Sequence, residues 1–165
     1  MKKIIFSSLL ITACLLTACR GGNNPTEVGQ QSGFCTLARG DLATGGKNVL
    51  YRCNGRAILQ TAQAQRFLNK FPIQVSFDQI PGQVIKQNDI THQSANASGR
   101  TDAVACERAV INAAAKFQRT AAKNGAHGVS NLHSWFEKQP ITGGEVICQA
   151  GTFHARVVMR ADYVR

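Results

Sequence analysis

The sequence predicts a single domain of the α/β class, in the α+β arrangement, with a mainly antiparallel sheet packed by one long central helix. Residues 101–124 place apolar side chains every three or four positions, which is the repeat of an amphipathic helix. Residues 153–163 alternate apolar and polar side chains, as a strand with one buried face does. We therefore expect the helix to cover one face of a sheet, accompanied by an N-terminal disulfide-stapled hairpin and a short helix.

The long helix has a signal at each end. Thr101 or Asp102 can accept hydrogen bonds from the first free backbone N–H groups, and Gly125 can adopt the left-handed conformation that closes a helix. The apolar residues between them form one stripe, which we expect to be buried: Cys106, Val110, Ala113, Phe117 and Ala121. The alanines at 113–115 carry little side chain, so the helix can lie close to the sheet.

Shorter patterns predict the elements before this helix. Residues 34–38 and 49–53 are short runs with apolar side chains, and the glycine pair at 45–46 between them favours a tight hairpin turn. The alanine-rich residues 56–69 predict a short helix that ends before Pro72.

Several strands and loops are expected from alternation and from turn residues. Residues 71–78 alternate cleanly and predict a half-buried strand, while residues 84–93 predict a polar strand near an edge, followed by a loop at 94–100. Residues 129–137, which include a tryptophan and a phenylalanine, predict another strand, with a return loop at 140–144.

The C-terminal segment changes phase in its middle. The apolar residues of 145–150 and of 153–164 fall on opposite parities, so we expect a bulge or a break near Gly151. This leaves two alternatives, one bent strand or two separate strands.

The first nineteen residues predict the export signal of a bacterial lipoprotein. Two lysines precede a short apolar run, which ends in Leu-Thr-Ala-Cys at Cys19 and resembles the lipobox, whose cysteine is acylated. The run is shorter than the roughly 20 apolar residues of a membrane-spanning helix, which disfavours that alternative. We expect residues 1–18 to be the signal peptide, Cys19 the lipidation site, residues 19–33 a flexible tether and residues 34–165 the domain.

The residue after the lipidation site and the charge bear on location and partners. In the sorting pattern of enterobacterial lipoproteins an aspartate at this position favours the inner membrane; Arg20 stands here, so we expect the outer membrane, facing the periplasm.

The formal net charge of +10 fits either solubility or contact with the cell wall or anionic headgroups. We expect no nucleic-acid partner, because the chain is exported and its basic residues are scattered without an aromatic stacking platform.

Six cysteines are present, of which Cys14 leaves with the signal peptide and Cys19 is the lipid site. Four remain in an oxidising compartment and predict two disulfides with three possible connectivities: Cys35, Cys53, Cys106 and Cys148. We favour Cys35–Cys53 and Cys106–Cys148, because Cys106 lies on the buried helix stripe and Cys148 shares a strand face with a valine. A structural zinc site is the alternative, although its close cysteine pairs are missing.

Histidines offer the remaining metal hypothesis. Among the four in the chain, His133 and His154 could be neighbours on adjacent strands of the solvent face and bind a metal; otherwise they are surface histidines. We expect no cofactor and no catalytic activity. The segment 40–48 departs from the P-loop spacing and lacks its hydroxyl residue, and no GxSxG, HExxH or free cysteine beside a histidine is found.

Three segments resemble a family of small proteobacterial lipoproteins and secreted proteins: residues 99–118, 121–136 and 145–164. Members usually read G-K-S-D-E-E-A-C before the helix, then G-A/G-N-A-V-V-N-I-x-S-Y-Y, then Y-E-C-x-A-G; here His-Gly stands at 127–128 for Asn-Ala and Trp-Phe at 135–136 for Tyr-Tyr. Some members are described as an excinuclease ATPase subunit, which does not suit an exported chain without a P-loop. A more distant likeness is to the Rcs-system outer-membrane stress-sensing lipoprotein.

The resemblance implies the fold, the lipidation and the disulfides rather than an activity. From it and from the missing catalytic motifs we expect a non-catalytic envelope binding or signalling module, which is held to the membrane by its lipid anchor and acts through contacts with an envelope protein. The alternative is a periplasmic metal-binding protein that uses the histidines.

Overall fold

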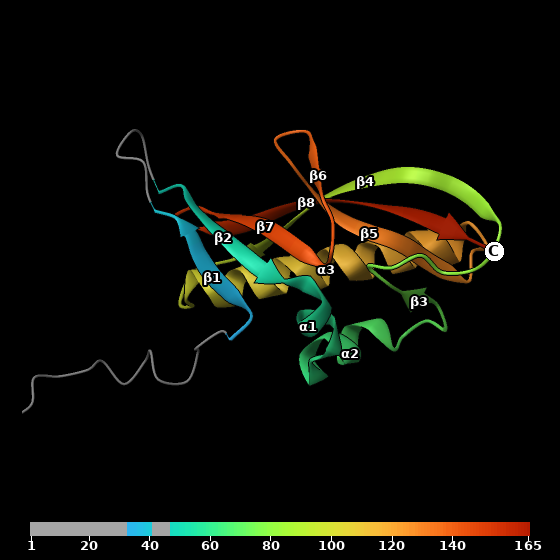
Figure 1. Ribbon diagram of the computed structural model, residues 1–165. Helices are drawn as coiled ribbons and strands as arrows, with labels where there is room; N and C mark the ends of the chain where they lie inside the picture. Colours follow the sequence, from blue (N-terminus) through green and yellow to red (C-terminus); the bar gives the residue numbers. More distant parts are fainter. Residues whose placement is uncertain (1–32, 41–46) are drawn as a thin grey trace, which may run out of the picture.

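A computed structural model of the protein describes residues 33–40 and 47–165 (Figure 1). The expected signal peptide, Cys19, the glycine pair at 45–46 and all of the expected tether except Gly33 lie outside these ranges. The helices are α1 (Gly55–Gln60), α2 (Ala62–Leu68) and α3 (Asp102–Lys123). The strands are β1 (Cys35–Arg39), β2 (Val49–Asn54), β3 (Gln74–Val75), β4 (Val84–Asn96), β5 (Gly128–Phe136), β6 (Gln139–Ile141), β7 (Glu145–Ala150) and β8 (His154–Val164).

The sheet is built around β8. One edge of β8 pairs with β4 along its length, while the other edge pairs first with β7 and then with β5. The path continues outward as β1-β2-β7 at one end and β5-β3 at the other, and β6 is added to β5. The pairs are antiparallel apart from β3 with β5. The predicted α/β class, with a mainly antiparallel sheet and one long helix, is therefore confirmed.

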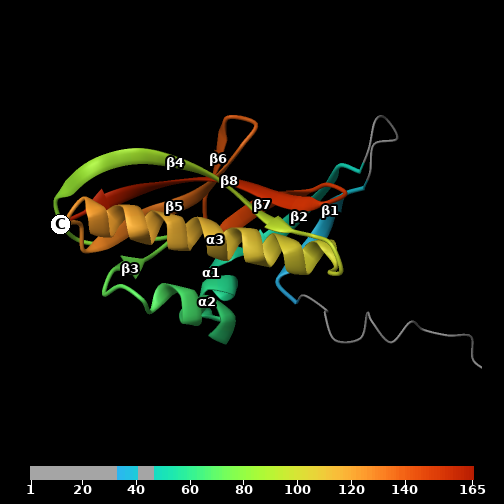
Figure 2. The same ribbon diagram turned by 180° about the vertical axis from the view of Figure 1, so that it is seen from behind.

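Helix α3 lies between the sheet and the two short helices (Figures 1 and 2). The predicted stripe is buried, with exposed fractions of 0–1%: Cys106, Val110, Ala113, Phe117 and Ala121. Further residues such as Ala105, Ala109 and Ala114 are also buried, because α1 and α2 contact α3 in addition to the sheet. The helix is thus a central layer, where the sequence predicted one buried stripe.

The predicted ends of α3 are also confirmed. The side-chain oxygen of Thr101 accepts a hydrogen bond from the backbone N–H of Val104 at 3.4 Å. At the other end Gly125 has φ +66°, the left-handed conformation that closes a helix at low cost when the residue is glycine.

Two disulfides are present among the described residues, and one of them joins the helix layer to the sheet. Cys106 of α3 is bonded to Cys148 of β7, and both residues are fully buried. Cys35 of β1 is bonded to Cys53 of β2, directly opposite it in the antiparallel register. The favoured connectivity is the one present, and it ties the helix to the sheet and the first strand to the second.

The helix predicted at residues 56–69 is broken in two at Thr61. This residue is extended, with φ −66° and ψ 148°, so it ends α1. Its side-chain oxygen then accepts a hydrogen bond from the N–H of Ala64 at 3.1 Å and caps α2. The threonine acts as a cap, a role that the alanine-rich pattern does not indicate.

The strand predicted at 71–78 forms ladder pairs only at Gln74 and Val75, although Ile73 and Phe77 are buried in the expected alternation. The partner β5 is irregular beyond this point, because Asn131 has φ +53° and shifts its register. In this segment the alternation in the sequence predicts which side chains are buried, whereas the shape of the partner strand β5 determines how many ladder pairs form.

The remaining elements differ from expectation in length or in kind. Strand β4 is an edge strand, as expected, but it runs on to Asn96. Part of the predicted loop 140–144 is strand β6, because Glu137 and Lys138 both have positive φ and make the tight turn that lets β6 pair with β5. The C-terminal segment is two paired strands, β7 and β8, the second of the two alternatives.

Candidate functional site

The two faces of the sheet carry different side chains. On β8 the residues that face α3 are buried, with exposed fractions of 0–1%: Ala155, Val157, Met159, Ala161 and Tyr163. The residues between them point to the face that α3 does not cover, which we call the open face: His154, Arg156, Val158, Arg160 and Asp162. The open face is where polar side chains are free to contact other molecules.

The open face is hollowed where two strands part. Strands β7 and β5 meet β8 one after the other along the same edge, and from this fork the β5–β6 hairpin projects away from the sheet (Figure 1). Ser134 of β5 is fully buried at the fork and accepts a hydrogen bond from the backbone N–H of Ile147 at 3.2 Å. The hydroxyl replaces a ladder bond and holds the two strands together where they diverge.

A cleft of about 600 Å³ lies between this hairpin, β4, β7 and β8. The side chains that give it chemical character come from the hairpin and from each of the other three strands: His92, Trp135, Phe136, Glu137, Gln149 and Arg156. This volume lies within the range of about 300–1,000 Å³ that is usual for ligand-binding pockets. The lining combines an aromatic wall with groups of both charges, and we take this cleft as the candidate functional site.

Trp135 is held in place by its neighbours. The guanidinium carbon of Arg160 lies 3.6 Å from the centroid of the indole ring, a cation–π contact, and the ring of His133 meets it edge-on at 6.5 Å. His133 is itself 6% exposed, and its Nδ1 lies 2.8 Å from the carbonyl oxygen of Asn131. These contacts therefore hold Trp135 in its position in the wall of the cleft.

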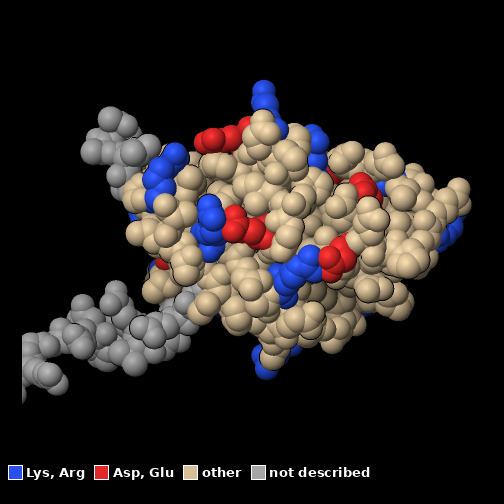
Figure 3. All heavy atoms as spheres, in the orientation of Figure 1, with Lys and Arg blue, Asp and Glu red and all other residues tan. Residues whose placement is uncertain are grey.

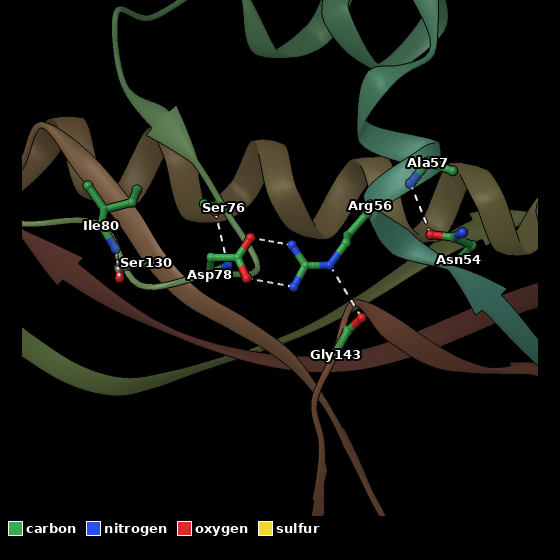
Figure 4. A network of polar contacts seen from close by, with 8 residues as sticks. All are labelled: Asn54, Arg56, Ala57, Ser76, Asp78, Ile80, Ser130 and Gly143. Carbon is green, nitrogen blue, oxygen red and sulfur yellow. Dashed lines mark hydrogen bonds and ion pairs between the residues drawn. The ribbon is translucent and has the colours of Figure 1, made fainter.

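The hairpin is also fixed at its base, by the network in Figure 4. Arg56 of α1 binds both carboxylate oxygens of Asp78, and its Nε donates to the carbonyl oxygen of Gly143, in the loop between β6 and β7, at 3.3 Å. The hydrogen bond from Arg56 holds the pKa of the Asp78 carboxyl below its usual range. Beside it, the N–H of Ile80 donates to Ser130 Oγ at 2.8 Å. These contacts connect α1 and the β3–β4 loop to the strands that carry the cleft.

The two histidines predicted as metal ligands do not meet. His133 lies opposite Arg160 of β8, whereas His154, on β8 itself, lies opposite Asn96 of β4. Residues 154 and 160 are about 20 Å apart along an extended strand. The prediction that the two histidines are neighbours is wrong, because the register of β5 places His133 opposite the second half of β8, whereas His154 is the first residue of that strand. Within residues 33–40 and 47–165 no group of three or more His, Cys, Asp or Glu side chains could hold a metal ion.

Charge on the surface is mixed. In the view of Figure 3, acidic side chains lie next to basic ones. Four ion pairs are present among the described residues: Lys47–Asp102, Arg52–Glu145, Arg56–Asp78 and Lys86–Asp89. The formal positive charge of the chain does not gather into a continuous basic surface on this face.

The cleft itself was missed by the sequence analysis. Trp135 and Phe136 were placed on a strand, but nothing local indicates that this strand leaves the sheet. No local signal was available, because the turn at Glu137 and Lys138, which projects the two aromatic residues, lacks the glycine or asparagine that usually indicates such a turn. Among the helices of the described ranges, none is long and apolar enough to cross a membrane. Comparisons with protein-family models, with curated proteins and with solved structures found no match.

Proposed function

We propose that the protein is a non-catalytic lipoprotein of the outer membrane that binds an extended segment of another envelope protein in the cleft on its open face. The observation that carries this proposal is the cleft of about 600 Å³ beneath the β5–β6 hairpin, with Trp135 stacked on Arg160 in its wall. Tryptophan and arginine are the residues that most often dominate the energy of protein interfaces.

The lining suits a peptide more than a small apolar ligand. Arg156 and Glu137 place opposite charges on β8 and on the hairpin, while Gln149 of β7, whose amide nitrogen donates to Asn48 Oδ1 at 2.8 Å, offers its amide oxygen as an acceptor. A bound segment with one acidic and one basic side chain would meet both charges, and its backbone could bond to the amide. Trp135 and Phe136 would cover its apolar side chains.

The anchor and the disulfides belong to the same proposal. Acylation at Cys19 would hold the domain near the membrane through residues 20–33, which enter it at β1. We further propose that β1 and β2 form one hairpin closed by Cys35–Cys53. Two disulfides that stiffen a domain of this size agree with an oxidising compartment such as the periplasm.

Photocrosslinking in living cells tests the proposal. A photoreactive phenylalanine derivative replaces Gln149 in the cleft, and in a matched control it replaces Lys123, which is exposed at the end of α3. We expect a discrete protein adduct from position 149 and none from position 123. Equal adducts from both positions, or no discrete adduct from position 149, would contradict the proposal.

A further inference from the structure

A second hollow, of about 330 Å³, lies on the other side of β4, between α2, α3, the last residues of β4 and the loop that leads into α3. Two helix faces form its walls. Arg108, Ile111 and Asn112 are spaced three and four residues apart on α3, and Gln63 and Phe67 are four apart on α2. The hollow is thus built by the packing of α2 on α3, independently of the open face.

One contact fixes the hollow to the sheet. The side-chain amide of Asn112 donates to the backbone carbonyl of Ser94 at 2.9 Å, on the edge of β4 that β8 does not use. This contact covers part of an edge strand that would otherwise be open to pairing. The floor of the hollow is apolar, since Ile111 is 2% exposed and Ala95 is 7% exposed.

Two arginines line the hollow without an acidic partner. Within the described part of the chain Arg108 forms no ion pair, and its Nε is buried with no hydrogen-bond partner. Arg100 reaches only the backbone carbonyls of Asn96 and Ser98, at the long distances of 3.5 and 3.4 Å. None of the described residues that line the hollow is an aspartate or a glutamate.

A buried guanidinium Nε without a hydrogen-bond partner is unusual in a fold, and among the described residues Arg108 shares it only with Arg160, whose guanidinium lies over Trp135. A buried donor without a partner costs free energy, so native structures rarely keep one unless a water, an ion or a ligand completes it. Arg56 shows the ordinary situation in the same protein, since both oxygens of one carboxylate meet its guanidinium. Arg56 uses its two terminal nitrogens for that carboxylate, but a planar guanidinium can also bind a carboxylate side-on, through Nε and one terminal nitrogen, and a ligand carboxylate bound in this second way would give Arg108 Nε its missing partner.

We propose that this hollow binds a carboxylate carried on a small, partly apolar group. Arg108 and Arg100 hold the carboxylate, the Asn112 and Gln63 amides offer further hydrogen bonds, and Ile111 with Phe67 contacts the apolar part. The C-terminus of a peptide and a free organic acid share this chemistry. The site shares only Ser94 of β4 with the cleft, and none of the groups proposed to bind the ligand lines the cleft, so it does not depend on the function proposed for the open face.

Saturation-transfer NMR on the full mature lipoprotein in lipid nanodiscs tests this site. The probes are N-acetyl-alanyl-alanine, the same dipeptide with a C-terminal amide, succinate and inorganic phosphate. We expect transfer to the alanine methyl groups of the acid and a signal about tenfold weaker, or less, for the amide, because the charge-assisted hydrogen bonds are lost. Succinate that displaces the acid dipeptide identifies a general carboxylate site, and failure to displace it identifies a peptide C-terminus.

Variants locate the binding. Arg108→Gln should weaken binding of the acid dipeptide by about tenfold or more, and Gln63→Glu should weaken it too, because it places a competing carboxylate beside the arginines. Arg119→Gln, at an exposed arginine of the same helix, should leave binding unchanged. Melting temperatures establish that all three variants are folded. Equal binding of acid and amide, displacement of the acid dipeptide by inorganic phosphate, or full binding in Arg108→Gln would overturn the proposal.

Discussion

The two faces of the sheet differ in burial and in the kind of side chain that they carry, and two neighbouring residues of β8 show the difference. Ala155 is fully buried beneath α3, whereas Arg156 is exposed and lines the cleft on the open face. The covered face carries small and apolar side chains and a disulfide, which set the distance between helix and sheet. The open face carries arginine, histidine, glutamine and tryptophan. The packing on which the fold depends lies on the covered face, and we propose that the open face serves recognition.

Loss of the disulfide on the covered face should have the largest effect on stability. Replacing Cys106 and Cys148 together by alanine should lower the free energy of unfolding by about 2–5 kcal/mol, because the bridge restrains the unfolded chain and joins α3 to β7. Thermal unfolding followed by circular dichroism measures this loss. The matched variant replaces Cys35 and Cys53, whose bridge closes 18 residues rather than 42, and should lose somewhat less. An unchanged melting temperature in the variant that lacks Cys106–Cys148 would show that this disulfide does not stabilise the fold.

A matched pair of leucine substitutions on β8 compares the faces directly. Ala155→Leu adds three carbons beneath α3, where the alanine is 0% exposed, and should cost about 1–3 kcal/mol through overpacking. Arg156→Leu, one residue later, should change the free energy of unfolding by no more than about 0.5 kcal/mol. Urea unfolding of both variants measures the difference. Similar losses in the two would show that the open face also supports the fold.

Acid should weaken a contact between the covered face and β4. Burial raises the pKa of the Asp89 carboxyl, but hydrogen bonds from Lys86 and from the buried Tyr163 hydroxyl, at 2.5 Å, outweigh it and hold this pKa below its usual range. The pKa is depressed in the folded state, so the stabilisation is present above the unfolded value of about 3.9 and is lost as the pH falls through the folded value.

We therefore expect the melting temperature of the parent to fall more steeply below about pH 4 than that of Asp89→Asn, which cannot titrate at this position. Melting curves between about pH 2 and pH 6 make the comparison. Parallel pH profiles for the two proteins would show that this carboxylate does not contribute.

Local signals explain which parts of the fold could be predicted. The ends of α3 follow from the hydrogen-bonding capacity of Thr101 and the backbone freedom of Gly125, both of which act within a few residues. The pairing of Cys106 with Cys148 followed from knowing which face of each element is buried. The break at Thr61 escaped prediction because an alanine-rich run and a capping threonine support two different structures, and packing on α3 decides between them.

The cleft depends on long-range pairing, which periodicity does not reveal. Its position follows from the irregular register of β5 between Ser130 and His133 and from the fork held by Ser134. The same irregularity explains why His133 and His154 are not neighbours, because it determines which residue of β8 lies opposite His133. Strand existence is a local property, but register between strands far apart in the chain is a property of the whole sheet.

The central claim is that the open face recognises a partner and is not needed for folding. Its most direct test is the adduct formed from the photoreactive residue at position 149 in Arg156→Glu, with Arg156→Lys and the exposed helix variant Arg119→Glu as controls. We expect Arg156→Glu to lose the adduct while its unfolding free energy stays within about 0.5 kcal/mol of the parent, and both controls to keep the adduct. An undiminished adduct in Arg156→Glu would contradict the claim, as would an adduct lost only because the protein had unfolded.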